Sequence, residues 1–199
     1  MLNKLRSFLQ PARGEPGGFP DFPVLQTENL TLRQIIAHDQ PTIFEGLSDE
    51  RVIKYYGVEY HTYEATGEQM QWYNTIYATK TGIWWGIARK EDEKLIGACG
   101  FNNWQQAHRK AEMGYWLLPA YWKQGIMQEV LPVVLTYGFR EMSLHRIEAF
   151  TETANKASEN LLKKFKFQVE GTLVDWEIKH DAFISIDIWA LLNKESCVK

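Results

Sequence analysis

The residues from Trp122 to Glu129 combine a lone glycine, Gly125, with the predicted start of a long apolar helix. Because glycine has no Cβ, the backbone at Gly125 can pass close to a ligand. The first N–H groups of a helix have no partner within it and lie at the positive end of the helix dipole, which suits a phosphate group. We therefore expect a phosphate-bearing cofactor here, with an ordinary turn as the alternative.

The elements around this stretch must hold it beside the residues that do chemistry. Three strand-like runs precede it, at residues 83–89, 94–103 and 109–118, and the connections between them are short. Short connections favour antiparallel neighbours, so we expect a meander. A helical stripe of apolar residues follows, and then a strand-like run at 146–151. Since a helix separates 109–118 from 146–151, these two strands should lie parallel with a right-handed crossover.

The remaining segments complete an α+β fold. Before the meander we expect a strand at 30–35 and helices at 38–47, 49–55 and 64–79; after the crossover, a helix at 155–164 and strands at 167–174 and 182–192. The predicted architecture is an antiparallel meander, one parallel β-α-β unit and a closing hairpin. We expect one domain over 28–192, preceded by an N-terminal arm and Pro/Gly-rich linker over 1–27 and followed by a tail over 193–199.

Composition excludes several classes of protein. The chain has 199 residues, 45% of them hydrophobic, with a net charge of -3 and a pI near 6.0, so a general nucleic-acid binder is disfavoured. The cysteines Cys99 and Cys197 show no metal-ligand spacing, and Cys99 lies in an apolar run typical of a buried thiol. No apolar run reaches the roughly 18–20 residues that span a bilayer. We expect a cytoplasmic protein that binds no membrane and no metal.

The order of these elements and several motifs resemble the GCN5-related N-acetyltransferase (GNAT) superfamily, and within it the ribosomal-protein-alanine acetyltransferase (RimJ/RimL-like) group. A Rossmann fingerprint and a P-loop are both absent from the sequence. The resemblance covers about residues 28–192. It is carried, in chain order, by Leu30-Thr31-Leu32-Arg33, Leu95 to Phe101, Ala111 to Trp122, Gly125 to Glu129, Asn155 to Ser158 and Glu170-Gly171.

The resemblance implies acetyl-CoA as the acetyl donor, with its pyrophosphate on the backbone amides of the loop. The family pattern is Gln or Arg, two residues, Gly, one residue, then Gly or Ala, and only the central Gly125 matches it cleanly. Met127 replaces the small last residue, while Lys123 could place a cation near the phosphates. The expected cofactor-binding residues are Leu117, Trp122, Lys123, Gln124, Gly125, Ile126, Met127 and Asn155.

Amide formation from a thioester needs a neutral amine, so a proton acceptor must lie near the reacting groups. Glu112 is the first candidate for this base, because it lies on the strand that leads to the loop and next to Met113-Gly114. The alternative is an exposed strand glutamate or a salt-bridge partner. The resemblance also implies that backbone N–H groups of residues 113–118 hold the thioester carbonyl as an oxyanion site.

Asn155 and Ser158 form an Asn-x-x-Ser pattern at the start of the second crossover helix. In the family, the asparagine binds the pantetheine arm and a nearby hydroxyl can serve the leaving thiolate. The alternative is helix capping, which both residue types do routinely. Where many members carry a general-acid tyrosine farther along this helix, this chain has Leu161-Leu162. Ser158 or water must therefore supply any proton that the thiolate takes.

Other polar and aromatic residues are weaker candidates for the site. Glu152, Asp175 and Glu177 could act as bases but are typical surface charges. Aromatic residues on half-buried strands usually pack in cores, although some could line an acceptor groove; these are Trp84, Trp85, Trp104, Tyr115 and Trp176.

The expected function is therefore N-acetyl transfer from acetyl-CoA to a primary amine, by direct attack in a ternary complex. The acceptor could be a protein N-terminus or a small amine, and the protein could be a homodimer. A non-catalytic acyl-CoA-binding module on the same fold is the alternative, favoured by Met127 and by the missing tyrosine. A pure interaction domain would leave the loop, Glu112 and Asn155 unexplained.

Overall fold

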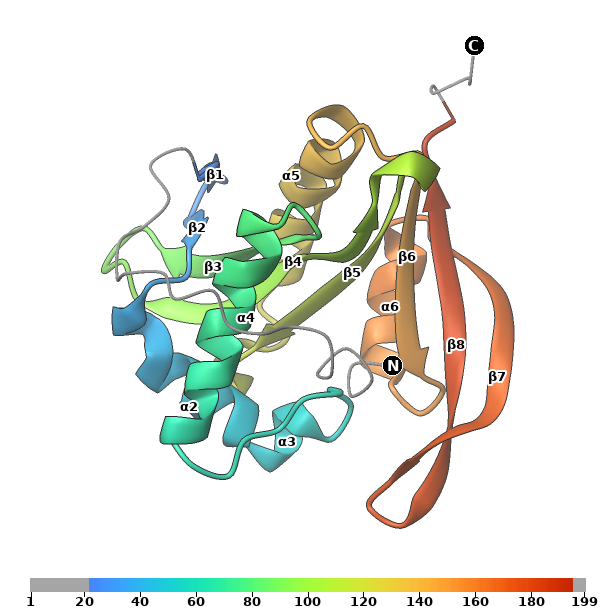
Figure 1. Cartoon of the computed structure of the whole chain (residues 1–199), viewed down its shortest axis with the longest axis horizontal. Helices are drawn as coiled ribbons and strands as arrows, with labels where there is room; N and C mark the ends of the chain where they lie inside the picture. Colours follow the sequence, from blue (N-terminus) through green and yellow to red (C-terminus); the bar gives the residue numbers. More distant parts are fainter. Residues whose placement is uncertain (1–21, 195–199) are drawn as a thin grey trace.

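The computed structural model describes residues 22–194, which form one mixed sheet with helices on both faces (Figure 1). The eight strands lie in the order β1-β2-β3-β4-β5-β6-β8-β7. Neighbours from β1 to β5 are antiparallel, β5 and β6 are parallel, and β8 inserts between β6 and β7 as an antiparallel partner of both. This topology confirms the meander, the single parallel unit and the closing hairpin.

The strand bounds follow the apolar runs of the sequence. The strands are β1 Leu25–Gln26, β2 Leu30–Gln34, β3 Ile83–Arg89, β4 Leu95–Gln105, β5 Lys110–Leu117, β6 Arg146–Glu152, β7 Gln168–Lys179 and β8 Ala182–Leu192. Edge strand β1 precedes residue 28, where we expected the domain to begin. Strand β7 continues beyond residue 174 through an irregularity between Leu173 and Glu177.

The helices fill the connections between these strands. The α-helices are α2 Gln40–Ser48, α3 Glu50–Ile53, α4 Gly67–Ala78, α5 Ile126–Arg140 and α6 Lys156–Lys164. Short 3₁₀ turns lie at Ala37–Asp39, Glu64–Thr66, Gln106–His108 and Pro119–Tyr121. Among the helices of residues 22–194, none is long and apolar enough to cross a membrane.

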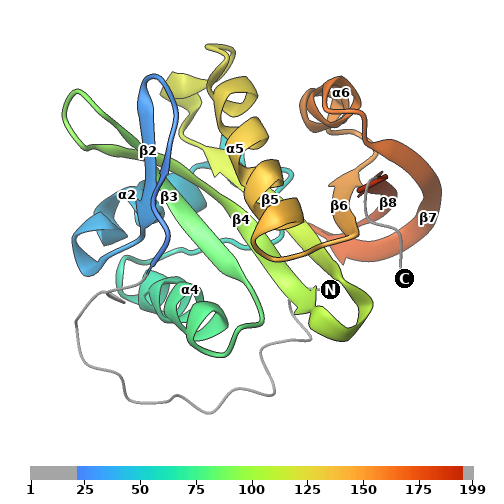
Figure 2. The same ribbon diagram turned by 90° about the horizontal axis from the view of Figure 1, so that it is seen from above.

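Two cores lie on opposite faces of the sheet because strand side chains alternate between the faces. Trp84 belongs to the core beneath α2–α4, whereas its neighbour Trp85 belongs to the core beneath α5 and α6. Figure 2 shows α2 and α4 on one side of the sheet and α5 and α6 on the other. The sheet therefore has a helix layer on each face.

Strands β5 and β6 separate part-way along their length (Figure 1). Their parallel pairing includes only Lys110–Arg146, Ala111–Ile147 and Glu112–Glu148. Strand β5 continues to Leu117 along β4, and β6 continues to Glu152 along β8. Beyond Glu112, the side of β5 that faces β6 is therefore left without a strand partner.

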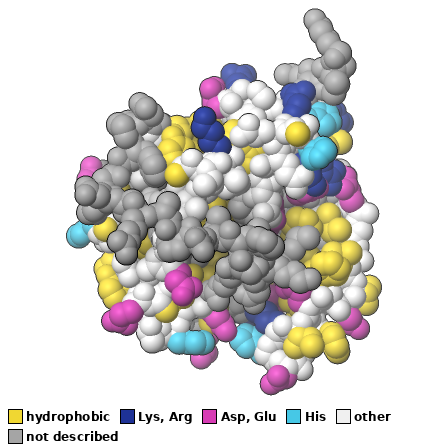
Figure 3. Space-filling view, viewed as in Figure 1, with side chains coloured by type: hydrophobic (Ala, Val, Ile, Leu, Met, Phe, Trp, Pro, Cys, Tyr) yellow, Lys and Arg dark blue, Asp and Glu magenta, His cyan; other side chains and the backbone are white. Residues whose placement is uncertain are grey.

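The β7–β8 hairpin carries exposed apolar side chains away from the helix layers. They include Val174, Trp176, Ile178 and Phe183. Figure 3 shows hydrophobic side chains gathered at the lower right of the molecule, where this hairpin lies in Figure 1.

Candidate active site

Two cavities meet where β5 and β6 separate. The first, the carboxylate cavity, has a volume of about 710 Å³ and is lined by β3–β6, α4 and the residues after α3, with Glu112 among them. The second, the loop cavity, has a volume of about 870 Å³ and is lined by residues 121–123, 125–128 and the first turns of α6. Both volumes suit a small-molecule site.

The boundary between the cavities is built from residues that line both of them: Tyr55, Tyr56, Tyr115, Asn155 and Ser158. The hydroxyl groups of Tyr115 and Ser158 form a 2.6 Å hydrogen bond that joins β5 to α6. Asn155 Oδ1 accepts a hydrogen bond from the Ser158 backbone N–H at 3.2 Å and so caps α6. The expected Asn155–Ser158 pair is thus brought together with Tyr115.

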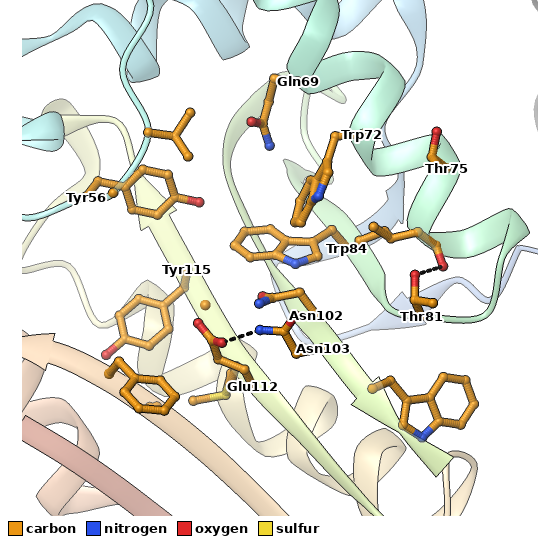
Figure 4. A pocket seen from close by; sticks show the side chains of 18 of the residues that line it. Tyr56, Gln69, Trp72, Thr75, Thr81, Trp84, Asn102, Asn103, Glu112 and Tyr115 are labelled. Carbon is orange, nitrogen blue, oxygen red and sulfur yellow. Dashed lines mark hydrogen bonds between the residues drawn. The ribbon is translucent and has the colours of Figure 1, made fainter. Parts of the chain in front are cut away.

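Glu112 points into the carboxylate cavity near Tyr115, as Figure 4 shows. Its Oε2 accepts a 2.7 Å hydrogen bond from Asn103 Nδ2. Asn103 lies at an irregularity of β4 between Asn102 and Gln105 and has a left-handed φ of 51°. Asparagine tolerates this conformation better than most residues, and a strained residue that holds a cavity carboxylate is typical of a functional site.

Burial raises the pKa of the Glu112 carboxyl above its ordinary value, and the nearby Glu148 carboxylate adds to this rise. Hydrogen bonds from Asn103 and Asn102 favour the ionised form and oppose the increase. Burial also raises the pKa of the Tyr115 phenol, so this group stays protonated at neutral pH. The carboxylate cavity therefore holds a carboxylate with raised basicity near the protonated hydroxyl pair at the boundary.

The loop before α5 places a glycine with a left-handed backbone conformation at the start of the helix. Gly125 is the N-cap of α5 and has a φ of 80°, a left-handed value that favours glycine. A Cβ at Gly125 would meet no heavy atom within 4 Å, so the space in front of it is open. The N–H groups of Gln128 and Glu129 donate to the Gly125 carbonyl, and the amides of Ile126 and Met127 lie ahead of them at the helix start.

Side chains around the loop leave its backbone accessible. Trp122 Nε1 donates to the Leu117 carbonyl at 2.8 Å, which fixes the loop against the end of β5. Met127 also lines the loop cavity, but its side chain is only 8% exposed and belongs to the core beneath α5 and α6. Its bulk is therefore accommodated largely by that core.

The charged residues of the two cavities have opposite signs. Among the described residues, those lining the carboxylate cavity include two acids, Glu68 and Glu112, and no lysine or arginine. Those lining the loop cavity include no acid and five cationic residues: Arg51, Lys54, Lys123, Lys156 and Lys164. The loop cavity is thus suited to an anionic ligand, and the carboxylate cavity to an amine.

Comparison with known proteins matches residues 29–168 to the acetyltransferase (GNAT) domain family. The chain belongs to the GNAT family. It is 38% identical over 173 residues to the uncharacterized N-acetyltransferase YoaA of Bacillus subtilis (strain 168). This alignment covers 86% of our chain and 98% of YoaA. The family, the fold and the N-acetyltransferase activity expected from the sequence are thereby confirmed.

Solved structures reproduce the same GNAT fold. RimL, a ribosomal alpha-N-protein acetyltransferase in complex with coenzyme A, aligns with a TM-score of 0.77 at 19% identity over 85% of this chain and 98% of its own. Spermidine N-acetyltransferase from Vibrio cholerae, in complex with CoA and spermine, aligns with a TM-score of 0.74 at 21% identity. This alignment covers 82% of our chain and 95% of the Vibrio cholerae chain.

The weaker candidates divide between the cavities and the rest of the molecule. Glu152 forms a 2.7 Å ion pair with Lys179, and neither it nor Asp175 or Glu177 lines the carboxylate cavity. Of the aromatic candidates, Trp84, Trp104 and Tyr115 line that cavity, whereas Trp85 is fully buried and Trp176 is exposed on β7. Cys99 is a free, buried thiol, and burial raises its pKa. Within residues 22–194, no group of three or more His, Cys, Asp or Glu could hold a metal ion.

Two contacts of the candidate site are not predicted from the sequence. Asn103 reaches Glu112 only because β4 is irregular there, and no local pattern signals this irregularity. Tyr115 was a candidate for the groove, but its hydrogen bond to Ser158 joins residues 43 positions apart. A search for a hydroxyl partner of Ser158 on the facing strand could have found it.

Proposed function

We propose that this chain transfers an acetyl group from acetyl-CoA bound in the loop cavity to a primary amine bound in the carboxylate cavity. The observation that carries the proposal is the junction of two oppositely charged cavities at Tyr115, Asn155 and Ser158. Two substrates, one bound in each cavity, can meet there without a covalent acetyl-enzyme. The buried position and raised pKa of the Cys99 thiol support direct attack.

The cofactor's pyrophosphate would bind the amides around Gly125 at the start of α5, where the helix dipole also favours negative charge. Lys123 lines the same cavity and would add a cation beside the phosphates. The pantetheine arm would continue between β5 and α6 past Asn155. Backbone groups of β5 beyond Glu112, which lack a β6 partner, would bind the arm and the thioester carbonyl.

Glu112 would take the proton of the attacking amine, directly or through one water molecule. Its raised pKa makes the carboxylate a stronger base than an exposed glutamate, while the hydrogen bond from Asn103 favours its ionised form. The neutral amine nitrogen then forms a bond to the carbonyl carbon of the thioester. We assign Asn103 as a positioning residue for this base.

Breakage of the carbon–sulfur bond leaves a thiolate, which needs a proton to depart as free CoA. Ser158 Oγ faces both cavities and would supply that proton, with the Tyr115 hydroxyl at 2.6 Å as its neighbour in the same hydrogen-bonded pair. The pair takes the place of the tyrosine that this chain lacks farther along α6. The products are an N-acetylated amine and CoA.

The proposal is tested by thiol release when the purified chain is mixed with acetyl-CoA and primary amines, together with calorimetry of acetyl-CoA binding. We expect saturable binding of acetyl-CoA and amine-dependent release of one thiol per acetylated product, confirmed by mass spectrometry. Binding of acetyl-CoA without turnover of any amine would instead assign the chain to acyl-CoA binding alone.

A further inference from the structure

Trp84 forms one wall of the carboxylate cavity and lies flat across two glycines. Gly100 pairs with Trp84 across β3 and β4, and Gly114 pairs with Gly100 across β4 and β5. A Cβ built on Gly100 would meet Trp84 Cγ at 2.6 Å, and one on Gly114 would meet Trp84 Cζ2 at 2.7 Å. The indole ring thus reaches from β3 across β4 to Gly114 of β5. A side chain at Gly114 would displace the ring, whereas one at Gly100 would also meet the backbone of β3.

Helix α4 adds a second aromatic residue to this wall. Trp72 packs against Trp84 with ring centroids 5.8 Å apart and an interplanar angle of 65°, and Tyr73 holds Trp84 from another side at 5.8 Å. Figure 4 shows Trp72 and Trp84 side by side across the cavity from Tyr115. Edge-to-face packing of this kind fixes the rings in place, so the cavity offers a rigid apolar surface.

Charge in the carboxylate cavity is sparse. Of its two acids, Glu112 lies on β5 in the same cavity as the boundary residue Tyr115, whereas Glu68 is an exposed residue of the first turn of α4. A ligand with several ammonium groups needs a carboxylate or water for each of them, because an unpaired charge is costly in an apolar site. One carboxylate near the boundary matches one amine.

We infer that the acceptor is a single primary amine on an aromatic body, with the amine at Glu112 and the body against Trp72 and Trp84. This inference rests on the proposed function and narrows its acceptor. The same chemistry is found in a small arylalkylamine and in a peptide whose N-terminal residue is aromatic. The inference disfavours, as acceptors, polyamines and peptides that begin with a small polar residue.

The test compares four acceptors at saturating acetyl-CoA: 2-phenylethylamine, a peptide that begins with phenylalanine, spermidine and a peptide that begins with serine. We expect kcat/KM for at least one aromatic acceptor to exceed that for spermidine and for the serine peptide by about tenfold or more. The two aromatic arms distinguish the small amine from the peptide. An equal or higher kcat/KM for spermidine or the serine peptide overturns the inference and leaves the proposed function intact. No thiol release with any of the four, despite acetyl-CoA binding, removes both.

Variants of the wall test the contact itself. Trp72→Leu should raise KM for the aromatic acceptor about fivefold to tenfold while KM for acetyl-CoA stays within about twofold, and Trp72→Phe should restore most of the loss. Trp176→Leu, at an exposed position on β7 outside both cavities, is the matched control and should change neither value. An unchanged KM for the aromatic acceptor in Trp72→Leu overturns the contact. Should Trp72→Leu unfold, the same reading applies to Trp72→Met, which keeps a larger apolar side chain at this position.

Discussion

The carboxylate cavity and the loop cavity share a boundary but select their ligands by different means. The loop cavity depends on backbone: the left-handed φ of Gly125, the amides at the start of α5 and a surrounding set of cations. The carboxylate cavity depends on side chains, with Glu112 held by Asn103 and flanked by packed aromatic rings. A site for a constant cofactor can be built from backbone, whereas a site that selects one amine needs side chains.

The largest expected effect comes from Glu112→Gln, which removes the proposed base and keeps the shape of the side chain. We expect kcat to fall by about 100-fold or more, with KM for acetyl-CoA within about twofold, because the change lies on the acceptor side of the boundary. Steady-state kinetics against acetyl-CoA and the amine separates the two values. Asp175→Asn, an exposed carboxylate outside both cavities, is the control. A retained kcat and an unchanged pH–rate profile would remove the assignment.

Glu112→Gln should also change how the free energy of unfolding depends on pH. The folded-state pKa of Glu112 is raised, so the native state binds this proton more tightly than the unfolded chain. Glu112 therefore lowers the free energy of unfolding as pH rises through the unfolded pKa and on to the folded one. Glu112→Gln should lose this component of the pH dependence and be more stable than the parent at neutral pH, as measured by urea unfolding across that range.

Gly125→Val tests the other cavity. Valine at a φ of 80° is strained, and its side chain would enter the open space in front of the loop. We expect Kd for acetyl-CoA to rise by about tenfold to hundredfold in calorimetry, with little change in KM for the amine. Gly171→Val is the matched control, because Gly171 also has open space around its Cβ position but lacks a left-handed φ. An unaltered Kd would show that the phosphates bind elsewhere.

The boundary itself is tested by Ser158→Ala, Tyr115→Phe and the double variant. If the two hydroxyls deliver one proton to the leaving thiolate as a unit, each single change should lower kcat by about tenfold and the double change by little more. Independent roles predict that the two losses multiply. Steady-state kcat values for the four proteins distinguish these results.

Asn103→Gly removes the amide that supports Glu112 while glycine keeps the left-handed backbone. Loss of a donor to the carboxylate raises its pKa further, so the base is protonated at a higher pH. The acid limb of kcat/KM should move to higher pH, with a fewfold loss of activity in mild acid and little at alkaline pH. A uniform loss across the pH range would point to a purely structural role.

The two cavities also differ in how well sequence alone predicts them. Gly125, the helix stripe of α5 and the Asn155–Ser158 pattern are local signals, and the structure brings them together as expected. The bounds of β3 follow equally from its aromatic and β-branched residues and from the charged turn after it. A site built from backbone can be predicted from local sequence because only a few residue types adopt a left-handed conformation or cap a helix.

The carboxylate cavity leaves weaker signals because its lining comes from segments far apart in the sequence. Trp84 and Trp85 are neighbours of the same type, yet only the pairing of β3 with β4 decides which one faces the cavity. Asn103 depends on an irregular strand pairing, and the contact of Trp72 with Trp84 depends on the packing of α4. These contacts are tertiary, so residue type and spacing predict them poorly.

The smallest expected effect on either cavity comes from the far end of α6, the helix whose first turn lies at the boundary. Lys166 has a left-handed φ of 67°, and the Phe167 N–H donates to the Leu162 carbonyl in the hydrogen bonding of a Schellman motif. Because lysine is strained there, Lys166→Gly should raise the free energy of unfolding by about 1 kcal/mol in chemical denaturation. Both KM values should stay at the parent's level. A shift in either KM would mean that the position of Ser158 responds to strain at the far end of α6. The two cavities would then not be independent, because α6 would affect ligand binding in both.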